Sequence, residues 1–228
     1  MTEEALSAAG TRVRVSPPTS ADIPAYAEAV RRSAHRMRPF AVADPDGLAP
    51  ALPRQGPDYR TFLIRALDPA GDHGLVGRVN VNTIVRGAYL GATIGYDAYD
   101  PYAGHGLFAE GLRVILAICF TPAPNGLGLH RIEANVQPAN TRSAGVLRRL
   151  GFVHEGFSPD YLWLPQHDDP TQFTWQDHDR YALLADRWIG TTYPPPTRPR
   201  LVVLVVGPGD GGLAAALARD LSLPALRQ

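Results

Sequence analysis

The sequence predicts a mixed α/β (α+β) fold built on a mostly antiparallel sheet. Three neighbouring segments have the alternating polar and apolar pattern of strands, and short turn sequences join them. A glycine-containing loop then leads into a helical pattern, and further strand and helix patterns follow it. We therefore expect a sheet flanked by helices, with its elements in mixed order along the chain.

The N-terminal part is expected to contain a strand, a helix and an irregular segment. Residues 12–15 alternate polar and apolar side chains, and polar residues at 19–22 offer N-caps for a helix that runs to about Arg32. Prolines and glycines interrupt every periodic pattern from 35 to 57. This composition predicts an irregular connection, a kind of segment that often shapes a substrate pocket.

An antiparallel meander is expected next. Strand patterns occupy residues 61–67, 75–84 and 88–96, and turn-forming residues separate them at 68–72 and at 86–87. Connections this short bring consecutive strands side by side in opposite directions. The three segments therefore predict the centre of the sheet.

A short glycine loop precedes the next helix. Gly104-His105-Gly106 is followed by a helical pattern from Leu107 to Phe120 with one apolar face. A helix N-terminus presents N–H groups that lack helical partners, and glycine lets a phosphate approach them closely. The loop suits a pyrophosphate, although the same three residues also make an ordinary tight turn with no ligand.

The remaining elements complete one domain. We expect a strand at 130–136, a helix at about 141–150 that a glycine ends, and strands near 152–157 and 178–184. The segment 165–174 between the last two strands is expected to be a solvated loop.

The C-terminal part is expected to be separate from the main domain at 1–190. A proline-rich run at 191–199 predicts a semi-rigid linker, and 200–228 has the pattern of a strand, a loop and a helix. This appendage resembles the start of a degenerate P-loop, because Leu213 and Ala214 occupy the positions of the lysine and the hydroxyl residue that hold phosphates and Mg²⁺.

Composition narrows the class of protein. Lys plus Arg and Asp plus Glu both number 22, so no overall charge favours direct binding to nucleic acid. The longest apolar run, 201–206, is too short to span a membrane, and the N-terminus has no signal-peptide pattern. The single cysteine, Cys119, lies in an apolar run and is expected to fill core space. We expect a soluble cytoplasmic protein that contacts no membrane.

A series of short motifs follows one another along the chain. They are Gly95-Tyr96, Gly104-His105-Gly106-Leu107-Phe108-Ala109-Glu110-Gly111-Leu112, His130-Arg131-Ile132-Glu133-Ala134-Asn135-Val136, Pro138-Ala139-Asn140, Ser143, Leu150-Gly151-Phe152, Glu155-Gly156, Asp160-Tyr161-Leu162 and Trp175-Gln176-Asp177-His178. In their order and spacing these motifs resemble the GNAT superfamily of acyltransferases. Within that superfamily, residues 130–184 resemble the RimJ/RimL group, which acetylates the α-amino groups of ribosomal proteins.

The resemblance implies a GNAT fold with a splayed sheet, and acetyl-CoA as co-substrate without a metal. The glycine loop would hold the pyrophosphate of CoA, and the strand before it would pair with pantetheine and polarise the thioester through its N–H groups. Pro101 stands where many members have Gln or Arg, which removes one side-chain contact. The cofactor-binding residues that the resemblance implies are Tyr96, Asp97, Ala98, Ala103, Gly104, His105, Gly106, Leu107, Phe108, Asn140 and Ser143.

The resemblance also implies the catalytic residues. Leu147 occupies the position of a tyrosine acid found in many relatives, so Ser143 is the expected acid for the departing thiolate. Asp160 and Glu133 are the candidate bases. Each carboxylate also has a structural interpretation, an ion pair with an arginine for Glu133 and a turn for Asp160. Asn140 similarly fits either a helix cap or a pantetheine ligand.

The expected reaction is direct attack of an amine on the thioester. An α-amino group of pKa about 7.8 is roughly one-tenth neutral at pH 7, whereas a lysine is neutral in only about one molecule in two thousand. An α-amino acceptor therefore needs only modest help from a base. The resemblance to the RimJ/RimL group implies that the acceptor is the N-terminus of a protein or peptide, such as a ribosomal protein, and we expect the enzyme to be a monomer or homodimer. The alternatives are an acetyltransferase for a small amine or antibiotic, and a catalytically weak acyl-CoA-binding module.

Overall fold

The computed structural model describes residues 6–41, 44–69, 74–166, 169 and 171–189. The predicted linker at 191–199 and the predicted appendage at 200–228 lie outside the described residues. Across the described part of the chain, no helix combines the length and the apolar character that crossing a bilayer requires.

Eight strands form one sheet in the order β1-β2-β3-β4-β5-β6-β8-β7. Neighbouring strands are antiparallel except for β5 and β6, which are parallel because α2 connects them. This mixed, mostly antiparallel sheet with flanking helices confirms the predicted fold class. The elements are β1 (Ala8–Ala9), β2 (Val13–Ser16), η2 (Ser20–Asp22), α1 (Ile23–Met37), η3 (Ala49–Ala51), β3 (Arg60–Ala66), β4 (Leu75–Val85), β5 (Gly91–Ala98), α2 (Leu107–Phe120), β6 (Arg131–Val136), α3 (Thr141–Arg149), β7 (Val153–Pro165), β8 (Phe173–Leu184) and η5 (Ala185–Arg187).

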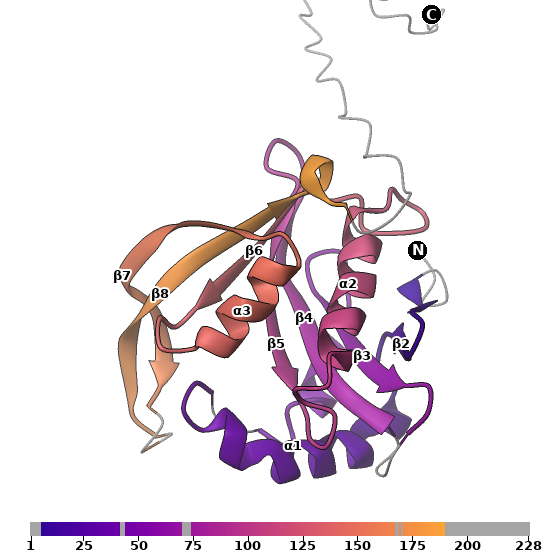
Figure 1. The fold of residues 1–228 in the computed structure, drawn as a ribbon, viewed down its shortest axis with the longest axis vertical. Helices are drawn as coiled ribbons and strands as arrows, with labels where there is room; N and C mark the ends of the chain where they lie inside the picture. Colours follow the sequence, from indigo (N-terminus) through magenta and orange to yellow (C-terminus); the bar gives the residue numbers. More distant parts are fainter. Residues whose placement is uncertain (1–5, 42–43, 70–73, 167–168, 170, 190–228) are drawn as a thin grey trace, which may run out of the picture. The chain divides into compact units, whose positions relative to one another are not determined.

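The helices cover opposite faces of the sheet. On β3, Leu63 belongs to a buried cluster with Tyr26 of α1, whereas its neighbour Ile64 belongs to the main core with Leu112 of α2. Successive side chains of a strand point to opposite faces, so α1 and α2 lie on different sides of the sheet. Leu147 of α3 is also in the main core, and Figure 1 shows α2 and α3 in front of the strands.

The two parallel strands separate at one end. β5 pairs with β6 from Gly91 to Ile94, opposite Arg131 to Ala134, but β5 itself continues to Ala98. Figure 1 shows the strands diverging beyond this paired region, with the loop before α2 at the far end of β5. An unpaired strand edge presents backbone donors and acceptors to a ligand. The splay predicted from the family resemblance is therefore present.

The first long helix extends beyond its predicted end. α1 continues to Met37, whereas the sequence pattern predicted an end near Arg32. Ser33 in the additional turn is fully buried, and its hydroxyl accepts a 2.9 Å hydrogen bond from the N–H of Asp100. Arg36 forms an ion pair with the same aspartate. These partners lie far along the chain, so local periodicity could not reveal that they hold the last turn.

The final hairpin is longer than predicted. The sequence placed its strands near 152–157 and 178–184 with a loop at 165–174, but β7 reaches Pro165 and β8 begins at Phe173. Trp163 lies opposite Trp175, with ring centroids 5.3 Å apart. Cross-strand aromatic pairs stabilise antiparallel strands. The predicted strand limits are wrong here, and strand replaces both ends of the predicted loop.

Candidate active site

The glycine loop adopts a backbone that favours glycine. Gly104 has a φ of 87° and Gly106 a φ of 82°, and both residues are exposed. Gly106 is the N-cap residue of α2, so Leu107 begins the helix. The first N–H groups of a helix have no helical partners. A Cβ on Gly104 would meet nothing within 4 Å, so there is open space beside the loop. A glycine is therefore favoured at this position by its positive φ and not by a lack of space.

An arginine from the start of the chain contacts this loop. The N–H of Arg12 donates to Oε1 of Glu110 (2.7 Å), and its Nε forms a 2.8 Å ion pair with Oε2. A terminal guanidinium nitrogen lies 3.5 Å from the carbonyl oxygen of His105. Burial acts to raise the pKa of Glu110, but the Arg12 N–H and guanidinium outweigh it and lower that pKa. Arg12 therefore places a positive charge beside the loop.

Sequence reasoning missed Arg12. The ion pair joins residues 98 positions apart, and no motif around Arg12 indicates its partner on α2. The one indication of a missing cation was Pro101, which stands where many GNAT members have Gln or Arg. In the structure the cation beside the loop is the guanidinium of Arg12, which directly precedes β2.

Tyr96 and Ser143 meet on the α3 side of the sheet. Their hydroxyl oxygens lie 2.7 Å apart, and either atom can be the donor. The Tyr96 ring packs against Phe108 of α2 with centroids 5.3 Å apart. Burial raises the pKa of Tyr96 to about 12, so the hydroxyl is protonated at neutral pH. The predicted acid thus shares a hydrogen bond with a predicted cofactor-binding residue.

Asn140 holds the start of α3. Its Oδ1 accepts a 3.1 Å hydrogen bond from the N–H of Ser143, so Asn140 is the N-cap residue. This is the structural interpretation that the sequence allowed. A contact from Asn140 to pantetheine stays a prediction, and the cap already fixes the position of Ser143.

Glu133 lies on the opposite side of the sheet from this pair. Ala134 next to it is buried in the core with Ile94, so Glu133 faces the α1 side. Its Oε1 lies 2.6 Å from Nε of Arg131, and Arg131 also pairs with Glu155. This is the ion pair with an arginine that we gave as the structural interpretation of Glu133. A role for Glu133 as base stays a prediction.

Asp160, the other candidate base, lies in an irregular part of the hairpin. It is exposed, has a φ of 46°, and falls where the pairing of β7 with β8 shifts between Ser158 and Leu162. Its N–H donates to Oδ1 of Asp177 at 2.9 Å. A positive φ in a residue other than glycine is uncommon and marks a locally constrained backbone. A role as base stays a prediction for Asp160, as it does for Glu133.

Asp97 contributes its side chain to the α1 side. Its carboxylate lies 3.2 Å from a terminal nitrogen of Arg78, and Arg78 donates a 2.6 Å hydrogen bond to the hydroxyl of Tyr26. Burial raises the pKa of Asp97, and the nearby guanidinium opposes that change. Through Arg78, the Asp97 side chain therefore helps to hold α1. Any contact of Asp97 with the cofactor would be made by its backbone.

Cys119 packs in the core as expected. Its side chain is fully buried on α2, and burial raises the pKa of the thiol to about 12. A thiol of such pKa is a poor nucleophile at neutral pH. Among the described residues, no group of three or more His, Cys, Asp or Glu side chains is arranged to hold a metal ion.

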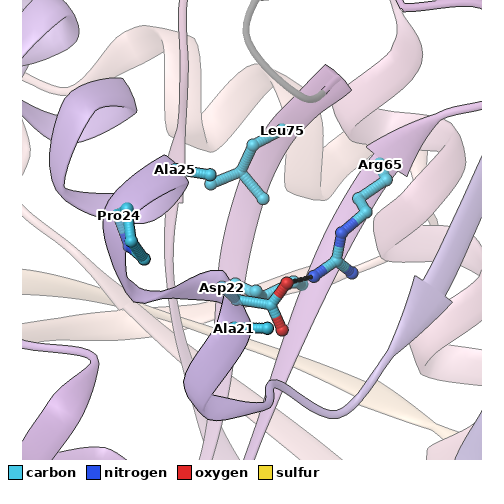
Figure 2. Close-up of a pocket in the computed structure, with 7 residues that line it drawn as sticks. Ala21, Asp22, Pro24, Ala25, Arg65 and Leu75 are labelled. Carbon is cyan, nitrogen blue, oxygen red and sulfur yellow. Dashed lines mark hydrogen bonds and ion pairs between the residues drawn. The ribbon is translucent and has the colours of Figure 1, made fainter.

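A pocket of about 380 Å³ lies between the start of α1 and strands β3 and β4. Figure 2 shows Asp22 and Arg65 meeting beside it, where they form an ion pair. Pro24 and Leu75 supply apolar surface. None of its lining residues is a predicted site residue, so this pocket is separate from the residues that the resemblance selected.

Comparison with known proteins decides the family. Residues 12–153 match the family described as "Acetyltransferase (GNAT) domain". The chain belongs to the GNAT acetyltransferase family. This confirms the predicted superfamily, and the match contains the glycine loop and the Tyr96–Ser143 pair.

Individual relatives of this GNAT chain point to the RimJ/RimL group. It is 33% identical over 127 residues to the [ribosomal protein uS5]-alanine N-acetyltransferase of Escherichia coli K12, a match that covers 56% of this chain and 59% of that relative. The crystal structure of the ribosomal-protein-S5-alanine acetyltransferase from Vibrio fischeri has a TM-score of 0.62 at 26% identity, covering 80% of this chain and 98% of that one. Mycobacterium smegmatis RimJ, solved in complex with CoA-disulfide, has a TM-score of 0.62 at 27% identity over 76% of this chain and 82% of that one.

Proposed function

We propose that this protein transfers the acetyl group of acetyl-CoA to the N-terminal α-amino group of a protein, such as a ribosomal protein. The observation that carries the proposal is the opening between β5 and β6, because Tyr96, with its partner Ser143, lies on the part of β5 that no longer pairs with β6. An acyl thioester entering there would meet backbone donors, a hydroxyl and an anion site together.

The cofactor would be held mainly by backbone. N–H groups at the start of α2 would bind the pyrophosphate, with open space at Gly104 and the Arg12 guanidinium next to Gly106. The guanidinium of Arg12 lies beside the same loop and would supply the positive charge that Pro101 cannot. The edge of β5 from Tyr96 to Ala98 would pair with the pantetheine amides.

The chemistry would use both sides of the sheet. A neutral amine would approach from the α1 side, attack the thioester carbonyl carbon, and lose a proton to Glu133 or Asp160 through water. The oxyanion would be stabilised by N–H groups of β5. The C–S bond then breaks, its electron pair stays on sulfur, and Ser143 on the α3 side donates a proton to it. Solvent carries the proton lost by the amine back to the serine, so charge and protons balance.

The proposed acceptor follows from chemistry and from the relatives. An α-amine needs little help to be neutral at pH 7, in contrast to a lysine. The relatives from Escherichia coli and Vibrio fischeri are named as enzymes that acetylate an alanine of ribosomal protein S5. Both facts favour a protein N-terminus over a small polyamine.

A thiol-release assay tests the proposal. The full chain is incubated with acetyl-CoA and peptides that differ in their first residue, beside small amines such as spermidine. We expect CoA release with peptides and little with the small amines. Faster CoA release with a small amine would show that the acceptor is a small amine and not a protein N-terminus. Calorimetric binding of acetyl-CoA without CoA release on any amine would indicate an acyl-CoA-binding module.

A further inference from the structure

The Tyr96–Ser143 hydrogen bond has a direction that matters for catalysis. Each hydroxyl carries one proton, and at a separation of 2.7 Å only one of these two protons lies between the oxygens. If Ser143 donates to Tyr96, the serine proton is already used and cannot reach a departing sulfur. If Tyr96 donates, the serine oxygen acts as acceptor and its own proton is free to point elsewhere.

The Tyr96 ring and the Ser143 backbone are held in place by independent contacts. The Tyr96 ring lies partly buried against Phe108 in the first turn of α2. The backbone of Ser143 is fixed by the 3.1 Å cap from Asn140. Two hydroxyls positioned in this way hold each other without requiring a ligand. Rotation of the two O–H bonds then decides which hydroxyl donates.

The state of Tyr96 favours donation. Burial raises its pKa to about 12, so the phenol keeps its proton throughout the physiological pH range. Even with its pKa raised to about 12, a phenol is more acidic than an aliphatic alcohol, so Tyr96 is the stronger hydrogen-bond donor of the two.

We propose that Tyr96 is a positioning residue that donates its hydrogen bond to Ser143 and thereby directs the serine O–H toward the CoA sulfur. This inference rests on the proposed acetyl transfer. Tyr96 thus acts through Ser143, in addition to the backbone contact with the cofactor that its place on β5 suggests. Because the orientation is set before the thioester arrives, the acid would need no rearrangement as the C–S bond breaks.

The test is a double-mutant cycle on the full chain, with kcat and KM for acetyl-CoA measured at saturating peptide. Tyr96→Phe keeps the ring that packs on Phe108 and removes only the hydroxyl. We expect Ser143→Ala to lower kcat by about 100-fold, as for loss of a general acid. Tyr96→Phe should lower kcat by roughly tenfold with KM unchanged, and the double variant should be no slower than Ser143→Ala alone.

Tyr181→Phe is the matched control. Tyr181 is buried on the same side of the sheet and its hydroxyl accepts a 3.1 Å hydrogen bond from Arg148. Its hydroxyl makes no hydrogen bond to Tyr96 or Ser143 and acts on Tyr96 through electrostatics alone, where it helps to raise the Tyr96 pKa, so its loss should leave kcat unchanged. An equal loss in this control would mean that any buried tyrosine hydroxyl on this face affects turnover, which contradicts a specific role for Tyr96.

The outcomes separate this inference from the proposed function. Wild-type protein that acetylates no amine overturns both. Acetylation by wild type with normal kcat in Tyr96→Phe, or with losses that multiply in the double variant, overturns the positioning role alone. Normal kcat in Ser143→Ala also overturns it, while leaving acetyl transfer in place.

Discussion

The hydroxyl oxygen of Tyr96 on β5 lies 2.7 Å from the hydroxyl oxygen of Ser143 on α3, 47 residues further along the chain. This contact joins the strand that has an open edge to the helix that follows the neighbouring strand. Since Phe108 packs on the same tyrosine, the glycine loop, the open edge and the candidate acid form one structural unit. The first predictions concern this unit.

Gly104→Ala should weaken acetyl-CoA binding by roughly tenfold, about 1.4 kcal/mol. The new methyl group would occupy the open space beside the loop, and a φ of 87° is unfavourable for alanine by about 1 kcal/mol. Isothermal titration calorimetry with acetyl-CoA measures the change in affinity, and thermal unfolding measures the cost in stability.

Gly87→Ala is the control for backbone strain. Gly87 has a φ of 86° and equally open surroundings, but it lies in the turn between β4 and β5. The two variants should lose similar stability, and only Gly104→Ala should lose affinity. If both variants bind acetyl-CoA with equal affinity, the glycine loop does not bind the pyrophosphate.

A variant that lacks the true base should have low activity at pH 7 and should recover part of that activity at pH 9. An α-amino group of pKa about 7.8 is mostly neutral at pH 9, so it then needs no base. We expect this profile in either Asp160→Asn or Glu133→Gln, with a loss of at least about tenfold at pH 7. A pH series of kcat/KM for both variants measures it.

Glu155→Gln controls for disturbance of the ion pairs around Glu133. Glu155 and Glu133 share Arg131 as partner. If Glu133→Gln acts only by releasing that arginine, then Glu155→Gln should reduce activity to a similar extent. Full activity in both Asp160→Asn and Glu133→Gln would reject a carboxylate base altogether.

Cys119 should take no part in the reaction. Its buried thiol has a pKa raised to about 12, so roughly one molecule in ten thousand carries a thiolate at pH 8. We expect no reaction with Ellman's reagent until urea unfolds the protein, and unchanged kcat in Cys119→Ala. A Cys119→Ala protein that keeps its melting temperature but loses turnover would point to a covalent acetyl-cysteine.

Arg65→Gln should lower the free energy of unfolding by about 2 kcal/mol at pH 7. Burial acts to raise the pKa of Asp22, but the Thr19 N–H and the Arg65 guanidinium outweigh it and lower that pKa below 3.8. A lowered carboxyl pKa stabilises the fold above the unfolded value and loses that effect as pH falls through the folded value. The difference between variant and wild type should therefore shrink below about pH 4.

Urea unfolding of both proteins at pH 7 and at pH 3 measures this effect. Arg65→Lys, which keeps the charge, should lose less stability at pH 7 than Arg65→Gln. A difference that stays constant with pH would assign the loss to packing of the arginine stem beside the pocket in Figure 2.

Local patterns predicted the elements that local physics determines. The limits of α2 agree with the sequence because its apolar face begins directly after a glycine loop and ends at Phe120. The N-cap of α3 was predictable as well, since Asn140 directly precedes the helix. The splay of the sheet was expected only because of the family resemblance.

Long-range contacts determine what the sequence could not reveal. The last turn of α1 depends on Asp100, and the length of the final hairpin depends on pairing such as Trp163 with Trp175. The same holds for Arg12, whose partner is 98 residues away. The pairing of Tyr96 with Ser143 required a fold, because neither residue carries a local sign of the other.

The most direct test of the central claim is acetylation of one peptide that has a free N-terminus and an internal lysine, followed by tandem mass spectrometry. The enzyme sequence contains no lysine, since all 22 Lys-plus-Arg positions are arginine, so any acetyl-lysine must come from the peptide. An N-terminally blocked copy of the peptide serves as control. We predict one acetyl group on the α-amine and none on the blocked copy. Acetylation of the lysine in both peptides, with a free α-amine left unmodified, would contradict the account.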